Sequence, residues 1–193
     1  MSMPRILVFA GSLRTGSFNQ KLAILAARSL EEAGSTVTHI SLADYPLPVY
    51  DADLESSEGL PDNAVRLKEQ FLAHSGIFLV SPEYNAGVTP LMKNTIDWVS
   101  RRHTENEPLL AAFRNRAFAI AGASPGGFGT MRGLLMLRQI LAVGTGAMVI
   151  PEQVTVSNAG NAFDENGELT EEVRRNQLAR AARSLVAIAK HYA

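Results

Sequence analysis

The chain has 193 residues, of which 18 are basic and 19 are acidic, so its formal net charge at pH 7 is −1. This balance excludes the strongly basic surface that nucleic-acid binding requires. The absence of cysteine excludes disulfides, thiolate metal sites and cysteine nucleophiles, and no metal site is expected. The apolar run near the N-terminus is too short for a signal sequence or a membrane span. We therefore expect a soluble, cytoplasmic protein with one domain over residues 1–193 and no membrane partner.

A short apolar run at residues 6–10 is followed by a loop of small polar residues and then by a helical pattern. Ser17 and Gln20 have the spacing of a capping box, which predicts that the helix begins after Ser17, and Gly34 is placed to end it. Strand, loop and helix in this order present unpaired backbone N–H groups to an anion. The loop therefore favours a phosphate site supplemented by Arg14, with an ordinary strand-to-helix turn as the alternative.

Apolar runs and helical patterns alternate along the rest of the chain. The strand at 36–40 has alternating polar positions, which places it near a sheet edge, and the strands at 76–80 and 117–121 are continuously apolar and hence buried. Helices are expected at 61–74, from Pro90 to about 101 with Thr89 as N-cap, at 130–143 and at 170–190. The segments 148–150 and 154–156 form one interrupted last strand, and 164–167 is a turn.

Five strand–helix units in succession predict an α/β fold in which a five-stranded parallel sheet has helices on both faces, giving three layers. In such sheets, ligands bind outside the carboxyl ends of the strands. The three loops expected there are residues 11–17, 82–89 and 123–129, and all three are rich in glycine, proline, serine or asparagine. Their coincidence at one edge strengthens the prediction of a phosphate-bearing ligand.

The sequence resembles the NADPH-dependent FMN reductase family, which includes chromate and quinone reductases and has a flavodoxin-like fold. The resemblance is carried by Gly11-Ser12-Leu13-Arg14-Thr15-Gly16-Ser17-Phe18-Asn19, by Pro82-Glu83-Tyr84-Asn85 and by Lys93-Asn94-Thr95-Ile96-Asp97-Trp98. It extends through the glycine-rich third loop to residues 137–141 and so covers nearly the whole chain. Two separated motifs at the expected strand ends make it specific for the family, although not for a substrate.

The resemblance implies FMN as cofactor and NADPH or NADH as co-substrate. The FMN phosphate would be held by Ser12, Arg14, Ser17, Phe18 and Asn19. The isoalloxazine would be lined by Pro82, Glu83, Tyr84 and Asn85, and faced from the third loop by Ser124, Gly126 and Gly127. No residue need act as a catalytic acid or base, because the flavin carries the redox chemistry and accepts hydride at its N5 atom.

The third loop also supports a different interpretation. Gly122-Ala123-Ser124-Pro125-Gly126 matches the G-x-S-x-G pattern, and Asp164 and His191 follow in the chain order of α/β-hydrolases. However, the residue after the nucleophile must donate its backbone N–H to the oxyanion, and Pro125 has none. A serine hydrolase built on Ser124 is therefore the weaker alternative. The remaining histidines, His39, His74 and His103, have no ligand spacing and are expected at the surface or in local caps.

The function predicted is an FMN-dependent NAD(P)H oxidoreductase that passes hydride from a nicotinamide through FMN to a small-molecule acceptor by a ping-pong mechanism. Quinones, chromate, azo compounds and free flavin are the acceptors that the resemblance suggests. A flavodoxin-like electron carrier is the nearest alternative, but carriers depend on strongly acidic surfaces and this chain is almost neutral. A flavin-free interaction module of the same fold is a third.

The helix around residues 133–141 contains four consecutive apolar residues, Leu134-Leu135-Met136-Leu137. Consecutive positions point in different directions around a helix, so the sheet cannot cover all four. Since large apolar patches are uncommon on monomers, we expect a homodimer or homotetramer. Arg132 and Glu152 are candidates for polar contacts between its subunits.

Overall fold

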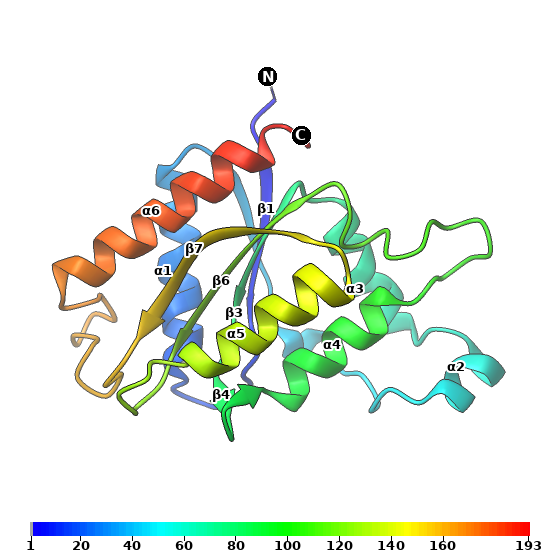
Figure 1. Ribbon diagram of the computed structural model, residues 1–193, viewed down its shortest axis with the longest axis horizontal. Helices are drawn as coiled ribbons and strands as arrows, with labels where there is room; N and C mark the ends of the chain where they lie inside the picture. The colour runs from blue at the N-terminus through cyan, green and yellow to red at the C-terminus, as the bar shows by residue number, and fades with distance from the viewer. Residues whose placement is uncertain (1) are drawn as a thin grey trace.

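The computed structural model describes residues 2–193 and contains a five-stranded parallel sheet with strand order β2-β1-β3-β6-β7 (Figure 1). This confirms the predicted sheet and places the polar second strand at an edge. A separate two-stranded antiparallel hairpin, β4–β5, follows β3. The strands are β1 (Arg5–Ala10), β2 (Thr36–His39), β3 (Gly76–Val80), β4 (Glu83–Tyr84), β5 (Gly87–Val88), β6 (Ala117–Ala123) and β7 (Met148–Val156).

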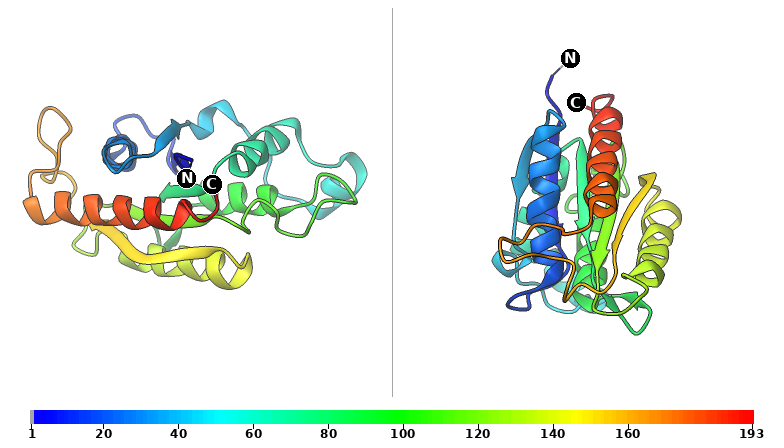
Figure 2. Two further views of the ribbon diagram at one scale, coloured as in Figure 1. Left: turned by 90° about the horizontal axis from the view of Figure 1, so that it is seen from above. Right: turned by 90° about the vertical axis from the view of Figure 1, so that its left-hand side faces the viewer.

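Helices cover both faces of the sheet, as expected for a flavodoxin-like three-layer fold (Figure 2). Two of them, α1 and α6, pack on one face, whereas α3, α4 and α5 pack on the other. The helical segments are α1 (Phe18–Glu32), η1 (Leu42–Asp44), α2 (Ala52–Glu58), α3 (Asp62–Leu72), α4 (Pro90–Ser100), α5 (Met131–Gln139), η2 (Ile140–Gly144) and α6 (Glu172–Ala189).

The two cores follow from the alternation of side chains along each strand. In β1, Ile6 and Val8 belong to the core under α1 and α6, whereas Leu7 and Phe9 belong to the core under α3, α4 and α5. All four side chains are fully buried. Burial on both faces explains why the central strands are continuously apolar in sequence.

Three segments differ from the sequence prediction. The short helix α2 and the hairpin β4–β5 were not predicted. The helix expected at 130–143 ends as α-helix at Gln139 and continues as one π-helical segment, η2. The interruption of the last strand is confirmed, since its register against β6 shifts between Phe118 and Ile120. Within residues 2–193, no helix is long and apolar enough to cross a membrane.

Candidate functional site

A cleft of about 310 Å³ lies at the carboxyl ends of the central strands, where the three predicted loops meet. It is not the largest hollow in the molecule, so its volume alone does not identify it as the site. Nine of the twelve predicted cofactor residues line it: Ser12, Arg14, Ser17, Phe18, Asn19, Pro82, Glu83, Tyr84 and Ser124. Ala123 and Pro125 also line the cleft, whereas Asn85, Gly126 and Gly127 lie outside its lining.

The first loop is held by the cap of α1. The Ser17 hydroxyl oxygen accepts hydrogen bonds from the backbone N–H groups of Asn19, at 3.2 Å, and Gln20, at 3.4 Å. Ser17 is therefore the predicted N-cap. The Gln20 side chain does not complete the capping box, because its amide instead donates to the backbone oxygen of Ser12 at 2.7 Å. This bond ties the start of the loop to the first turn of the helix.

The first loop has hydrogen-bond donors that lack an acceptor in the chain, which indicates an anion site. Within residues 2–193, the backbone N–H groups of Thr15, Gly16 and Phe18 have no hydrogen-bond acceptor. Arg14 forms no ion pair in that part of the chain; its guanidinium donates to the backbone oxygen of Thr15 and lies 5.6 Å from the ring centre of Phe18. A cation without a carboxylate, next to free amides at a helix N-terminus, is the arrangement that holds a phosphate.

Asn19 joins the first loop to the end of β6, where the third loop begins. Its amide nitrogen donates to the backbone oxygen of Ala123 at 2.8 Å, and its amide oxygen accepts from the backbone N–H of Ala123 at 2.9 Å. Asn19 is buried, and this reciprocal pair uses both of its polar groups. Its visible contribution to the cleft is thus to position the loops rather than to offer a free donor.

The second loop forms the β4–β5 hairpin, which places an aromatic side chain beside the cleft. Asn85 and Ala86 form its turn, with φ values of 50° and 64°. A type I′ turn, which joins two strands through a loop of two residues, requires a positive φ at both of them. Tyr84, immediately before the turn, is 54% exposed, so a broad aromatic face remains open at the mouth of the cleft.

Glu83 is bound to the start of α5. Its carboxylate accepts from Arg132 Nε at 2.8 Å and from the backbone N–H of Gly133 at 3.0 Å. Thr130, the N-cap of α5, makes no side-chain cap bond, so Glu83 supplies the missing acceptor from another loop. Arg132, expected to contact another subunit, therefore has an ion-pair partner within its own chain.

Gly122 allows the second and third loops to approach closely. A Cβ atom at this position would lie 2.4 Å from the backbone oxygen of Ser81 and 2.1 Å from Oγ1 of Thr130. Thr130 itself has a φ of 69°, an uncommon conformation for a β-branched residue. Only glycine fits between these atoms, so the end of β6 is packed tightly against the neighbouring strand end.

The structure does not assemble the hydrolase triad. Ser124 follows β6 at the cleft, whereas His191 follows α6 at the opposite end of the sheet, beside the first residues of the chain (Figure 1). Asp164 caps its own turn, since Oδ1 accepts from the backbone N–H groups of Asn166 and Glu168. Ser124 therefore has no histidine base at the cleft end of the sheet, and Pro125 offers no oxyanion donor.

Known proteins that resemble this chain identify the family to which it belongs. The model of the family described as NADPH-dependent FMN reductase matches residues 4–161. The chain belongs to this family. An NAD(P)H-dependent FMN reductase of Pseudomonas aeruginosa is 35% identical over 182 residues, which are 94% of this chain and 92% of the relative. A quinone reductase of Escherichia coli is 37% identical over 141 residues, which are 71% of this chain and 69% of the relative.

The solved structures that resemble this member of the NADPH-dependent FMN reductase family support its fold. The flavoenzyme NAD(P)H:(acceptor) oxidoreductase FerB from Paracoccus denitrificans superposes with a TM-score of 0.78 at 24% identity. The match covers 98% of this chain and 99% of FerB. The flavodoxin-like architecture inferred from the sequence is thereby confirmed.

Two residues of the family-resembling motif in α4 lie outside the lining of the cleft and hold the proline-rich segment before α2. The Asn94 side chain donates to the backbone oxygen of Pro48 and accepts from the backbone N–H of Tyr50, both at 2.8 Å. Trp98 Nε1 donates to the same Pro48 oxygen at 2.8 Å, and its ring meets that of Tyr50 edge-on. These residues are structural in this chain.

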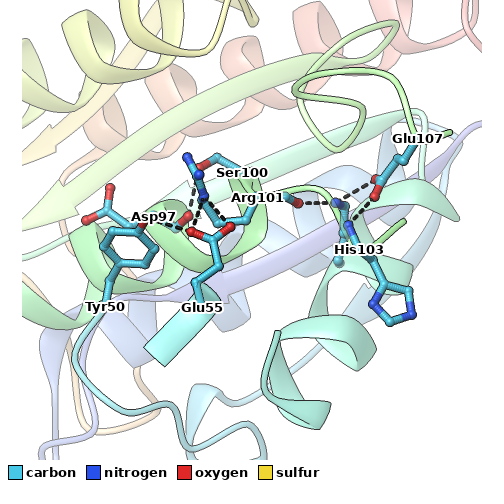
Figure 3. Close-up of polar contacts among 8 residues, drawn as sticks. Tyr50, Glu55, Asp97, Ser100, Arg101, His103 and Glu107 are labelled. Carbon is cyan, nitrogen blue, oxygen red and sulfur yellow. Dashed lines mark hydrogen bonds and ion pairs between the residues drawn. The ribbon is translucent and has the colours of Figure 1, made fainter. Parts of the chain in front are cut away.

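A second polar cluster lies at the carboxyl end of α4 (Figure 3), and none of its residues lines the cleft. Arg101 Nε donates to both carboxylate oxygens of Glu55, at 2.8 and 2.9 Å, and the Tyr50 hydroxyl donates to Glu55 at 2.8 Å. Next to it, Glu107 accepts from the backbone N–H of His103 and pairs with the buried Lys68 at 2.6 Å. The cluster joins α2, α3 and the end of α4.

Proposed function

We propose that this NADPH-dependent FMN reductase holds FMN in the cleft, with the phosphate at the first loop and the isoalloxazine between the second and third loops. The single observation that carries the proposal is the unpaired Arg14 beside free backbone amides at the N-terminus of α1. The hydroxyls of Ser12 and Ser17 add further donors, since the Ser17 oxygen accepts bonds while its hydrogen is free to donate.

The ring end of the cleft fits a planar heteroaromatic group. Pro82 and Tyr84 supply apolar surface, and Ser124 faces them from the third loop. Asn85, Gly126 and Gly127, next to the lining, stay predicted contacts of the ring. When bound, FMN supplies the two-electron redox chemistry, and the protein contributes binding and orientation.

We assign no catalytic acid or base to the chain. Among the described residues that line the cleft, Glu83 is the one carboxylate, and its oxygens are occupied by Arg132 and the backbone N–H of Gly133. No histidine is among the described residues of the lining. A substrate that is reduced by hydride transfer and takes its further proton from solvent suits such a site.

Arg14→Ala tests the phosphate end. Removing the only cation of the lining should raise the dissociation constant for FMN roughly 10- to 100-fold, the usual range for hydrogen bonds to a charged group. FMN binding is measured by the quenching of flavin fluorescence, and the fold by circular dichroism. Arg28→Ala is the matched control, because Arg28 lies on the same helix and pairs only with Glu168 at the surface.

An unchanged FMN affinity in Arg14→Ala would remove the phosphate assignment. Loss of folding in that variant would instead return the first loop to a purely structural role. The flavin-free interaction module predicts a colourless protein in which Arg14→Ala changes nothing.

We infer a ping-pong mechanism in which the nicotinamide and the acceptor occupy the same open face in turn. Support comes from the single cleft shared by all three loops and from the exposed ring of Tyr84 at its mouth. Parallel lines in double-reciprocal plots of NADPH oxidation against quinone concentration are expected. Intersecting lines would show that both substrates bind together, and comparison with NADH reports the preferred nicotinamide.

Quinones are the acceptors best supported, since relatives from several organisms are named quinone reductase. Chromate, azo compounds and free flavin are proposed as further acceptors of the same open face. An electron carrier would retain FMN without turnover of NADPH. Membership of the reductase family favours turnover over that alternative.

We also propose that the protein assembles as a homodimer or homotetramer through α5. The sheet buries Leu134 and Leu137 and leaves Leu135 and Met136 58% and 44% exposed, so it covers only part of the apolar run. Glu152 Oε2 is buried without a hydrogen-bond partner in the described chain, as expected where a second subunit supplies the donor.

A further inference from the structure

The amino ends of the three central strands enclose a second pocket, at the opposite end of the sheet from the cleft. Arg5 begins β1, Ser75 precedes β3 and Arg116 precedes β6, and all three line a hollow of about 290 Å³. The same strands lead at their other ends to Ser12, Pro82 and Ala123 of the cleft. The remaining lining residues are Ser2, Met3, Leu72, Ala73, His74, Asn115, Tyr192 and Ala193.

Arg116 is buried with donors left over. Its side chain is 7% exposed, and Nη1 donates to the backbone oxygen of Ala112 at 2.6 Å. Nε is fully enclosed and has no acceptor within residues 2–193, and Nη2 forms no hydrogen bond there either. Nη2 is thus the donor of this guanidinium that a ligand can reach, and hydrogen bonds from a guanidinium to a carboxylate or phosphate are of the strong, charge-assisted kind.

Nothing in the described chain neutralises this charge. Neither Arg5 nor Arg116 forms an ion pair within residues 2–193, and no lining residue is Asp or Glu. Ala193, the last residue described, also lines the pocket, but its carboxylate is not paired with either arginine. Burial lowers the pKa of Arg116 to about 10, with no opposing contribution from an anion. A buried cation without a counter-ion is costly, and such groups are normally paired.

The other groups around the pocket do not replace an anion. His74 is 3% exposed, and burial lowers its pKa; the hydrogen bond to Gln70 opposes this shift, and the charges of Arg5 and Arg116 add to it. Its ring nitrogens are occupied by the backbone oxygen of Gln70 and the hydroxyl of Thr38. The C-termini of α3 and α6 meet here, and each supplies only about half a negative charge.

We propose that this pocket binds a small oxyanion, a phosphate, between Arg5 and Arg116. Arg116 would donate to it from Nη2, and Arg5, which is exposed at the rim, would add a second charge. The site is separate from the cleft and does not depend on the function proposed for it. Inorganic phosphate and the phosphate group of a small metabolite share this chemistry.

The test is calorimetric titration of the protein, loaded with one equivalent of FMN, with inorganic phosphate in a phosphate-free buffer. Saturable binding at one site is expected, and Arg116→Gln and Arg5→Gln should each raise the dissociation constant roughly 10- to 100-fold. Arg183→Gln, which removes the same charge from the exposed face of α6, should leave it unchanged. A second titration with glycerol 3-phosphate distinguishes the sources: competition supports a phosphate monoester, and binding of inorganic phosphate alone supports the free ion.

Absence of saturable binding would overturn the proposal. So would binding that is lost in Arg14→Ala and kept in Arg5→Gln, because the phosphate would then occupy the first loop of the cleft. If circular dichroism shows that Arg116→Gln does not fold, Arg5→Gln decides the question, since the Arg5 side chain lies at the surface.

Discussion

The Glu55 carboxylate is the point at which α2 is attached to the rest of the molecule. Burial alone raises the pKa of this group, but hydrogen bonds from Arg101 and Tyr50 and the charge of Arg101 bring it below its ordinary value of 4.5. A carboxyl with a lowered pKa in the folded state stabilises the fold above its ordinary pKa. That contribution is lost as the pH falls through the lower folded value.

Glu55→Gln should therefore lower the free energy of unfolding at neutral pH and have a progressively smaller effect below pH 4.5. We expect at most about 1 kcal/mol, because Arg101 is half exposed and solvent screens the pair. Urea denaturation of both proteins across this pH range is the measurement. Glu58→Gln, an exposed change at the end of the same helix, is the control; a constant difference at all pH values would contradict the assignment.

The sequence predicts which residues line the cleft. It does not predict which of their polar groups already have hydrogen-bond partners within the chain. Ser17 was predicted as N-cap because capping depends on neighbours in the chain. The polar groups of Asn19 are occupied by Ala123, which is 104 residues away in sequence. Those of Glu83 are occupied by Arg132 and Gly133, which are 49 and 50 residues away. Only the packed strand ends reveal which polar groups are already satisfied and which, like Arg14, are free.

At the scale of elements, α4 anchors a long connection that has little structure of its own. The segment between η1 and α2 lies against α4 through hydrogen bonds of Asn94 and Trp98 to Pro48 and Tyr50. Pro48 has no backbone N–H, and its oxygen is shared by two donors from α4. Asn94 alone binds both a carbonyl and an N–H of the segment.

Asn94→Ala should release this segment. Losing both bonds should lower the free energy of unfolding by about 1–3 kcal/mol, because each of the two contributes a net of about 0.5–1.5 kcal/mol. Limited proteolysis should then cut between residues 45 and 60 faster than in the parent chain. Lys93→Ala is the neighbouring control, since its surface ion pair with Asp97 contributes only about 0.3–0.5 kcal/mol. Equal cleavage of both variants would show that other contacts hold the segment.

Elements whose apolar residues recur with a strand or helix period were predicted, and short elements without such a period were missed. The strand β3 has the predicted bounds, because every one of its residues is buried and apolar. The helix α2 buries no residue, so it leaves no apolar period in the sequence; its one signal is Asp51, which caps the backbone N–H groups of Asp53 and Leu54. The hairpin β4–β5 has two residues per strand, too few to show alternation.

At the scale of the whole molecule, the exposed side of α5 adjoins the cleft. Met136 lies next to Gly87 in the hairpin, where a Cβ atom would be 3.4 Å from its sulfur. The first turn of α5 is bound to Glu83 of the same hairpin. A second subunit packed on α5 would therefore contact the hairpin that carries Tyr84. Because this hairpin also borders the ring end of the cleft, loss of the assembly should affect FMN binding there.

The apolar face of α5 predicts that Leu135→Lys dissociates the assembly. Met131, one helical turn before Leu135 on α5, extends the exposed apolar surface, and a lysine in the centre of such an interface would have to be buried without a partner. Sedimentation velocity at micromolar concentration should show a dimer or tetramer for the parent chain and a monomer for the variant. Because the hairpin borders this face, FMN affinity should fall in the monomer as well.

Ile24→Lys separates this effect from a general response to surface charge. Ile24 is also an exposed apolar residue, but it lies on α1, on the opposite face of the sheet. This variant should keep the assembly and the FMN affinity of the parent, because α1 borders only the phosphate end of the cleft through its N-terminus. A parent chain that sediments as a monomer would refute the assembly, and the exposed face of α5 would then need another partner.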